Sequence, residues 1–155
     1  MKRLVTMSAF QPDLLIKDIN DHPVAIVEVQ SRINMSSDVA TEIRRNMLDR
    51  GLPTYVPYFL LISQDKGFLW INHLTKDHDS LPDYEFSMDK VISRYSPKEP
   101  EQRLYQTELA LLILQWLTNL SLKPQELTEE PEKTLAIAGF NESIKDAMVL
   151  IEENL

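Results

Sequence analysis

Residues 24–30, which read Val-Ala-Ile-Val-Glu-Val-Gln, constrain the fold of this chain more than any other segment. Their β-branched side chains suit a pleated, half-buried surface and predict a strand. Residues 13–19 are also rich in apolar side chains and follow Pro12, which suits the start of a strand. Between them, residues 20–23 read Asn-Asp-His-Pro, a turn sequence. The two segments therefore predict an antiparallel β-hairpin with a four-residue turn.

A helix is predicted after the hairpin, from residue 37 or 38 to residue 50. The candidates for its N-terminal cap are Ser36, Ser37 and Asp38, and its end is marked by Gly51 and Pro53. Apolar side chains recur along it at helical spacing and predict its buried face, namely Val39, Ile43, Met47 and Leu48.

The remaining segments predict further strands followed by helices. Strands are expected at 2–7, 58–63 and 68–72, with a turn at 64–67, a polar loop at 74–85, a short helix at 87–93, and two C-terminal helices at 101–120 and 133–153. This order predicts a single α/β or α+β domain spanning residues 1–155, in which helices pack on a mixed sheet.

Composition limits the classes of protein to consider. The 155 residues are 43% hydrophobic and contain no cysteine, so disulfides and thiolate metal sites are excluded and a reducing, cytoplasmic location is expected. The longest apolar stretch, 109–120, is interrupted by polar residues and falls short of the roughly 20 that span a membrane. The formal net charge of −8 argues against tight non-specific binding to DNA.

The helix around residue 109 is apolar on nearly every side. Such a helix is expected to be buried all round. Two interpretations remain open, packing inside the subunit or a homodimer interface through residues 104–120.

Two carboxylates are expected to meet on the predicted hairpin. If the hairpin closes about residues 21 and 22, paired positions add up to 43, which sets Asp13 opposite Gln30 and Leu15 opposite Glu28. Asp13 and Glu28 then become diagonal neighbours on one face, within about 8 Å at the backbone. Two such carboxylates are costly unless a cation compensates them, and oxygen ligands suit Mg²⁺ or Mn²⁺. For either residue alone, an ordinary strand position is the simpler interpretation.

The spacing Pro12-Asp13, fourteen residues, then Glu28-Val29-Gln30 resembles the PD-(D/E)XK signature of the restriction-endonuclease-like nucleases. The resemblance covers about residues 10–72, including the helix and strand that follow. It implies a nuclease-like core at 1–95 with a helical C-terminal extension at 96–155. It also implies that Asp13 and Glu28 hold a metal ion, Mg²⁺ or Mn²⁺, and that Gln30 occupies the position of a catalytic lysine.

The glutamine at position 30 departs from that signature. An amide can hydrogen-bond a water molecule, but it carries no charge to stabilise a developing anion. Lys17 or Arg32 is a candidate to supply that charge. Arg44 and Arg45, on the helix, could contact a phosphate backbone, although a solvated face paired with Glu42 or Asp49 is the simpler expectation.

The aromatic and imidazole side chains give no second site. The histidines, His22, His73 and His78, have no metal-ligand spacing and are expected at the surface. Trp70 and Trp116 are expected in the core rather than as platforms for stacked bases. The sequence therefore leaves two candidate functions. One is a metal-dependent nuclease acting on DNA, and the other is a catalytically inactive relative that binds nucleic acid or protein.

Overall fold

The computed structural model describes residues 11–96, 98–99, 102–123 and 129–151, so the strand expected at 2–7 lies outside it. The strands are β1 (Leu14–Lys17), β2 (Pro23–Val29), β3 (Tyr58–Ile62), β4 (Lys66–Ile71), β5 (Tyr84–Ser87) and β6 (Met148–Ile151). The helices are α1 (Ser37–Asp49), α2 (Asp89–Tyr95), α3 (Gln106–Leu122), α4 (Glu132–Ile137) and α5 (Phe140–Ser143), with a 3₁₀ turn η1 at His73–Thr75.

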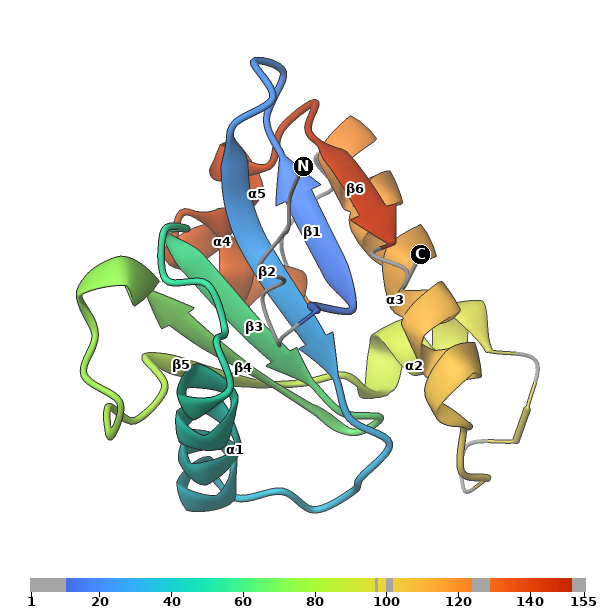
Figure 1. The fold of residues 1–155 in the computed structure, drawn as a ribbon. Helices are drawn as coiled ribbons and strands as arrows, with labels where there is room; N and C mark the ends of the chain where they lie inside the picture. Colours follow the sequence, from blue (N-terminus) through green and yellow to red (C-terminus); the bar gives the residue numbers. More distant parts are fainter. Residues whose placement is uncertain (1–10, 97, 100–101, 124–128, 152–155) are drawn as a thin grey trace, which may run out of the picture.

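The strands form one mixed sheet in the order β5-β4-β3-β2-β1-β6 (Figure 1). Strands β2 and β3 run parallel, which α1 makes possible by carrying the chain back between them, and the other neighbours are antiparallel. The expected α+β class, a mixed sheet flanked by helices, is confirmed.

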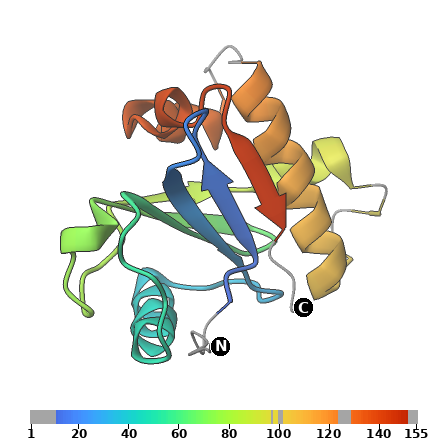
Figure 2. The ribbon, with the colours of Figure 1, turned by 45° about the horizontal axis from the view of Figure 1, so that its top comes forward.

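Each face of the sheet has its own core. On one face α1 packs over the side chains of β2, β3 and β4, including Ile26, Phe59 and Trp70. On the other face α2, α3, α4 and α5 cover a larger cluster that includes Trp116 (Figure 2). Both tryptophans are buried, as expected. Within the described residues, no helix is long and apolar enough to cross a membrane.

Helix α1 begins and ends where its sequence predicts. The Ser36 side chain accepts a hydrogen bond from Val39 N at 3.1 Å, and Gly51 follows the cap with φ of 99°. Its buried face, however, includes Arg44, which is fully buried in place of a solvated position. The buried face of α1 is therefore less apolar than its sequence predicts.

The Arg44 guanidinium is held by a buried histidine, so the expectation that His73 lies at the surface is wrong. Arg44 Nη2 and Nε lie 3.0 and 3.3 Å from His73 Nδ1, and Nη1 donates to Asp77 O at 2.9 Å. Because Nδ1 accepts, Nε2–H donates to Pro53 O at 2.9 Å. The guanidinium also lies over the Trp70 ring, 5.4 Å from its centroid. This network ties α1 to the loop that precedes β3 and to the segment that follows β4.

The network predicts acid sensitivity. Burial lowers the pKa of His73 to about 4, and the positive charge of Arg44 acts in the same direction, against the hydrogen bond to Pro53. The unfolded chain therefore binds an extra proton below its ordinary pKa of 6.5, so stability is lost as pH falls from 6.5 towards 4. We expect this component to reach about 2 to 3 kcal/mol. Urea unfolding of the wild type and His73→Gln should show it as a difference that grows with acidity. A constant difference would contradict the prediction.

The C-terminal part of the chain differs from its prediction. The helix expected at 133–153 is replaced by α4, α5 and strand β6, so residues 96–155 are not an all-helical extension. Gly139, with φ of 80°, separates α4 from α5. The apolar run Met-Val-Leu-Ile then joins the sheet beside β1. Strand β5 likewise begins within residues 74–85, where the sequence predicts a loop. Both strands are four residues long and gain their stability from neighbours rather than from local pattern.

Candidate functional site

The hairpin brings Asp13 and Glu28 closer together than its expected register would. Leu14 pairs with Val27 and Leu15 with Ile26, so paired positions add up to 41 rather than 43. The pairings of Asp13 with Gln30 and of Leu15 with Glu28 are therefore wrong, and continuing the observed register sets Asp13 directly opposite Glu28.

The cause of the shift lies in the turn. The Asp18 carboxylate accepts hydrogen bonds from Asn20 N and His22 N, both at 2.9 Å. Asp18 N donates to His22 O at 2.9 Å, and Asp21 takes a φ of 66°. The loop thus closes over residues 18–22, and the pairing becomes irregular between Ile16 and Lys17. This side-chain-stabilised turn moves the hairpin centre by one residue.

Each carboxylate holds the backbone of the opposite strand. Asp13 N donates to Glu28 Oε2 at 2.7 Å, and Val29 N donates to Asp13 Oδ2 at 2.8 Å. At the open end of the hairpin, these bonds replace the regular backbone-to-backbone hydrogen bonds between β1 and β2. They use one oxygen of each carboxylate, and no other described residue hydrogen-bonds to Asp13 Oδ1 or Glu28 Oε1.

The pair is short of positive charge. Glu28 is only 5% exposed, and burial, with the negative charge of Asp13 second, raises its pKa to about 8. The Asp13 N–H and the charge of Arg50 act in the opposite direction. Burial also raises the pKa of Asp13, opposed by the Val29 N–H. Two carboxyl groups are thus held together where their charges are costly.

Gln30 lies just beyond β2 and is partly buried. Its backbone N–H donates to Ile62 O at 2.8 Å, which continues the pairing with β3. Because side chains alternate along a strand, Gln30 shares the α1 side of the sheet with Glu28. The amide is therefore placed next to the carboxylate pair.

The two residues expected to supply the charge that Gln30 lacks, Lys17 and Arg32, are not at the pair. Lys17 lies four residues along β1 from Asp13, about 13 Å away. Its ammonium is 3.5 Å from Asp21 Oδ1 at the turn. Arg32 is exposed in the loop after β2. Neither residue supplies a cation beside Glu28.

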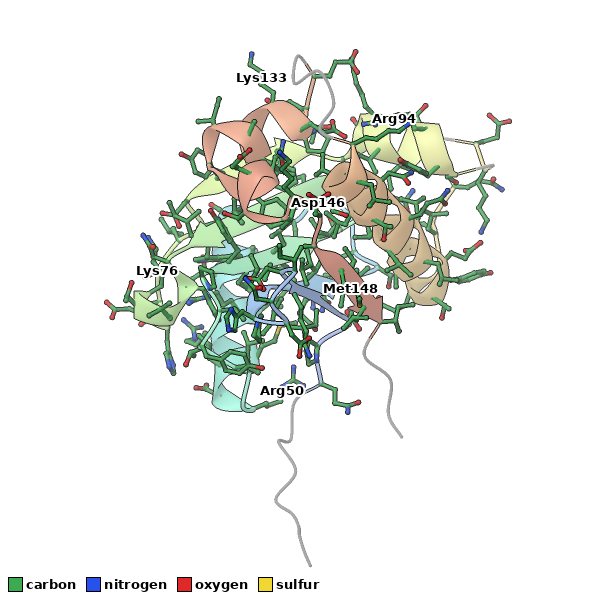
Figure 3. The ribbon with its side chains drawn as sticks, turned by 90° about the horizontal axis from the view of Figure 1, so that it is seen from above. Arg50, Lys76, Arg94, Lys133, Asp146 and Met148 are labelled. Atoms are coloured by element: carbon green, nitrogen blue, oxygen red, sulfur yellow. The ribbon has the colours of Figure 1, made fainter. Side chains whose placement is uncertain are left out.

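Arg50 is the cation that sequence reasoning missed. It forms the C-terminal cap of α1, and its positive charge lowers the pKa of Glu28. Figure 3 shows Arg50 on the side of the sheet that carries α1. Glu28 lies on the same side, because it alternates in step with Ile26 of the core under α1. The sequence gives no signal for this approach, because it depends on how α1 packs on the sheet.

The two helix arginines have different surroundings. Arg44 is fully buried in its contacts with His73 and Asp77, which leaves it no access to a phosphate. Arg45 Nη1 lies 2.7 Å from Asp79 Oδ1, and its Nη2 lies 3.9 Å from Glu42 Oε2. Arg45 thus belongs to a solvated, ion-paired helix face.

The donor atoms at the pair suit a hydrated, hard divalent cation. Asp13 and Glu28 each keep an oxygen outside the described hydrogen bonds, and a 2+ ion would offset their charge. Across the described ranges, no three His, Cys, Asp or Glu side chains come together as a metal-binding group. Mg²⁺ is commonly bound through only one or two carboxylates and keeps several water ligands. A two-carboxylate site therefore fits that ion.

A cavity among the described residues lies away from the pair. It has a volume of about 810 Å³ and is lined by Ile33, Asn34, Gln64, Asp65, Asp89, Lys90, Ile92, Ser93, Lys98 and Arg103. Lys90 and Lys98 are paired with Glu129 and Glu108, each at 2.9 Å or less. Its cations are thus largely neutralised, and it gives no independent indication of an anionic ligand.

Comparison with known proteins gives no assignment. No family model matches the chain, and neither a curated protein nor a solved structure matches it.

Proposed function

We propose that this protein is a divalent-metal-dependent nuclease that hydrolyses DNA phosphodiester bonds, with Asp13 and Glu28 as its metal ligands. The observation that carries the proposal is the placement of two carboxylates face to face at the end of a buried hairpin, each holding the other strand and each keeping a further oxygen. The resemblance of the Asp13, Glu28 and Gln30 spacing to the PD-(D/E)XK signature supports the same chemistry.

The surrounding residues have distinct roles in this proposal. A bound Mg²⁺ or Mn²⁺ would supply positive charge that lowers the pKa of a water ligand and offsets charge on the phosphate. Asp13 and Glu28 hold that ion. Gln30 orients the attacking water through its amide, and Arg50 supplies the nearby positive charge that an amide lacks.

Cleavage of supercoiled plasmid in Mg²⁺ or Mn²⁺ tests this function. Asp13→Asn and Glu28→Gln keep an oxygen that can accept each backbone N–H, so the fold is expected to survive. Both should nick at least about 100-fold more slowly, since metal-ion stabilisation of a transition state amounts to several kcal/mol. Asp21→Asn, which removes an exposed carboxylate from the same hairpin, should nick at the wild-type rate. If Asp13→Asn and Glu28→Gln nick plasmid as fast as Asp21→Asn, the assignment of Asp13 and Glu28 as metal ligands is refuted.

A second candidate is a catalytically inactive module that binds nucleic acid or protein. The reciprocal hydrogen bonds favour it, because Asp13 and Glu28 then serve to close the hairpin without a metal. The uncharged Gln30 and the net charge of −8 point the same way. A wild type that neither binds Mn²⁺ nor nicks DNA would exclude the first candidate and leave this one to be tested by its partners.

A further inference from the structure

The two edges of the sheet differ in how they are protected. Strand β5 carries Glu85, which lies 3.5 Å from Lys66, so that edge presents charge. Strand β6 pairs with β1 on one side, and no strand of the described ranges pairs with its other side. Natural proteins usually guard such an edge with charged residues, proline or a bulge. Residues 148–151 provide none of these.

Strand β6 is apolar and partly exposed. It reads Met-Val-Leu-Ile, with Met148 61% and Ile151 37% exposed. Its unpaired backbone groups along the open edge form a template on which another extended strand can pair. The edge therefore calls for a strand whose side chains are also apolar.

Helix α3 extends this uncharged surface. It lies beside β6 in all three views, and Asp146 N, just before β6, donates to Ser121 O at 2.9 Å (Figure 3). The exposed residues Leu111 and Leu122 line small hollows that they share with Tyr95 of α2.

Ala110, Leu114 and Thr118 recur every fourth residue along α3 and are all partly buried. Ala110 and Leu114 pack against the same core cluster as Val149 of β6. No charged residue occurs from 109 to 122. The β6–α3 surface, defined as residues 148–151 with these three side chains, thus has no formal charge, although 26% of the whole chain is charged.

We infer that the β6–α3 surface is a homodimer interface in which β6 pairs antiparallel with β6 of a second copy. Two copies that each carry a net charge of −8 repel one another, and a charge-free surface is where they can approach. A twofold axis perpendicular to the sheet keeps each face continuous, so Val149 meets its own equivalent and Met148 meets the partner's Leu150. The α3 helices run antiparallel across the same axis, which sets opposite ends of their dipoles together.

This interface differs from one formed by α3 alone. Most of the apolar surface of α3 is buried within its own subunit, including Leu109, Ile113 and Trp116. In the proposed interface, the edge of β6 supplies the hydrogen bonds between the two copies. Helix α3 adds an uncharged strip of side chains beside that edge. The inference does not depend on the nuclease proposal.

Sedimentation equilibrium and cross-linking test the dimer. The full chain should sediment at twice its 18.0 kDa mass at micromolar concentrations, and Met148→Lys should sediment as a monomer with unchanged circular dichroism. Ile137→Lys places the same charge on an exposed apolar residue of α4 and should remain dimeric.

Because the chain has no cysteine, single-cysteine variants report the pairing directly. Opposite residues of antiparallel strands lie about 4.5 to 5.5 Å apart at Cα, within disulfide range. Val149→Cys, or Leu150→Cys if the register is shifted, should form a covalent dimer on mild oxidation, whereas Glu85→Cys on β5 should not.

Two outcomes would overturn the inference. One is a monomeric wild type with no disulfide in either β6 variant. The other is a monomer whose β6 amides resist hydrogen exchange, which would mean that another part of this chain covers the edge. If Met148→Lys fails to fold, the wild-type mass and the cysteine pair still decide the question.

Discussion

Replacing Arg44 by alanine will lower the free energy of unfolding at pH 7 by about 3 to 5 kcal/mol, in the range for truncating a large, fully buried side chain. The substitution leaves His73 Nδ1 and Asp77 O without the donors they now have. It also removes the side chain that packs over Trp70 and leaves a cavity under α1. Urea unfolding at pH 7 measures the loss.

The neighbouring Arg45 provides a matched control. Its contacts with Asp79 and Glu42 are at the surface, where ion pairs contribute about 0 to 1 kcal/mol. Arg45→Ala should therefore have a small effect. Similar losses for the two alanine variants would show that the Arg44 network does not hold α1 in place.

Replacing Glu28 by glutamine will stabilise the metal-free protein at pH 8. The folded-state pKa of Glu28, about 8, lies above the ordinary 4.5, so its contribution to stability is fully present below pH 4.5 and is lost as pH rises towards 8. At about 1.4 kcal/mol per pKa unit, the loss approaches about 5 kcal/mol, which Glu28→Gln should largely recover. Unfolding in urea with EDTA, at pH 4.5 and at pH 8, measures it.

The control is Glu42→Gln on the exposed face of α1, which should change stability little at either pH. The gain from Glu28→Gln should be several-fold larger at pH 8 than at pH 4.5. A gain that is the same at both values would mean that the buried charge is not the cause. Destabilisation at pH 8 would mean that the charge is already compensated in the metal-free protein.

Local patterns predicted the elements that position the site. The β-branched run of β2, the Ser36 cap and Gly51 end of α1, and the buried strand β3 each carry a signal within a few residues. Their order was enough to expect a hairpin followed by a crossover helix, and hence Asp13 and Glu28 on one face.

The details of the site depend on contacts between distant residues. The hairpin register depends on the Asp18 carboxylate, whose bonds to Asn20 N and His22 N move the turn by one residue. Arg50 approaches Glu28 only because α1 packs on the sheet. The burial of Arg44 requires His73 from 29 residues away, which no pattern on α1 records.

Calorimetric titration of Mn²⁺ into the wild type, Asp13→Asn and Glu28→Gln at pH 7.5 tests the central claim most directly. A metal site at Asp13 and Glu28 should give a binding isotherm for the wild type, with uptake of metal releasing a proton because Glu28 is largely protonated beforehand. Neither variant should show measurable binding. Absence of binding to the wild type, or unchanged binding in both variants, would contradict a metal site at Asp13 and Glu28.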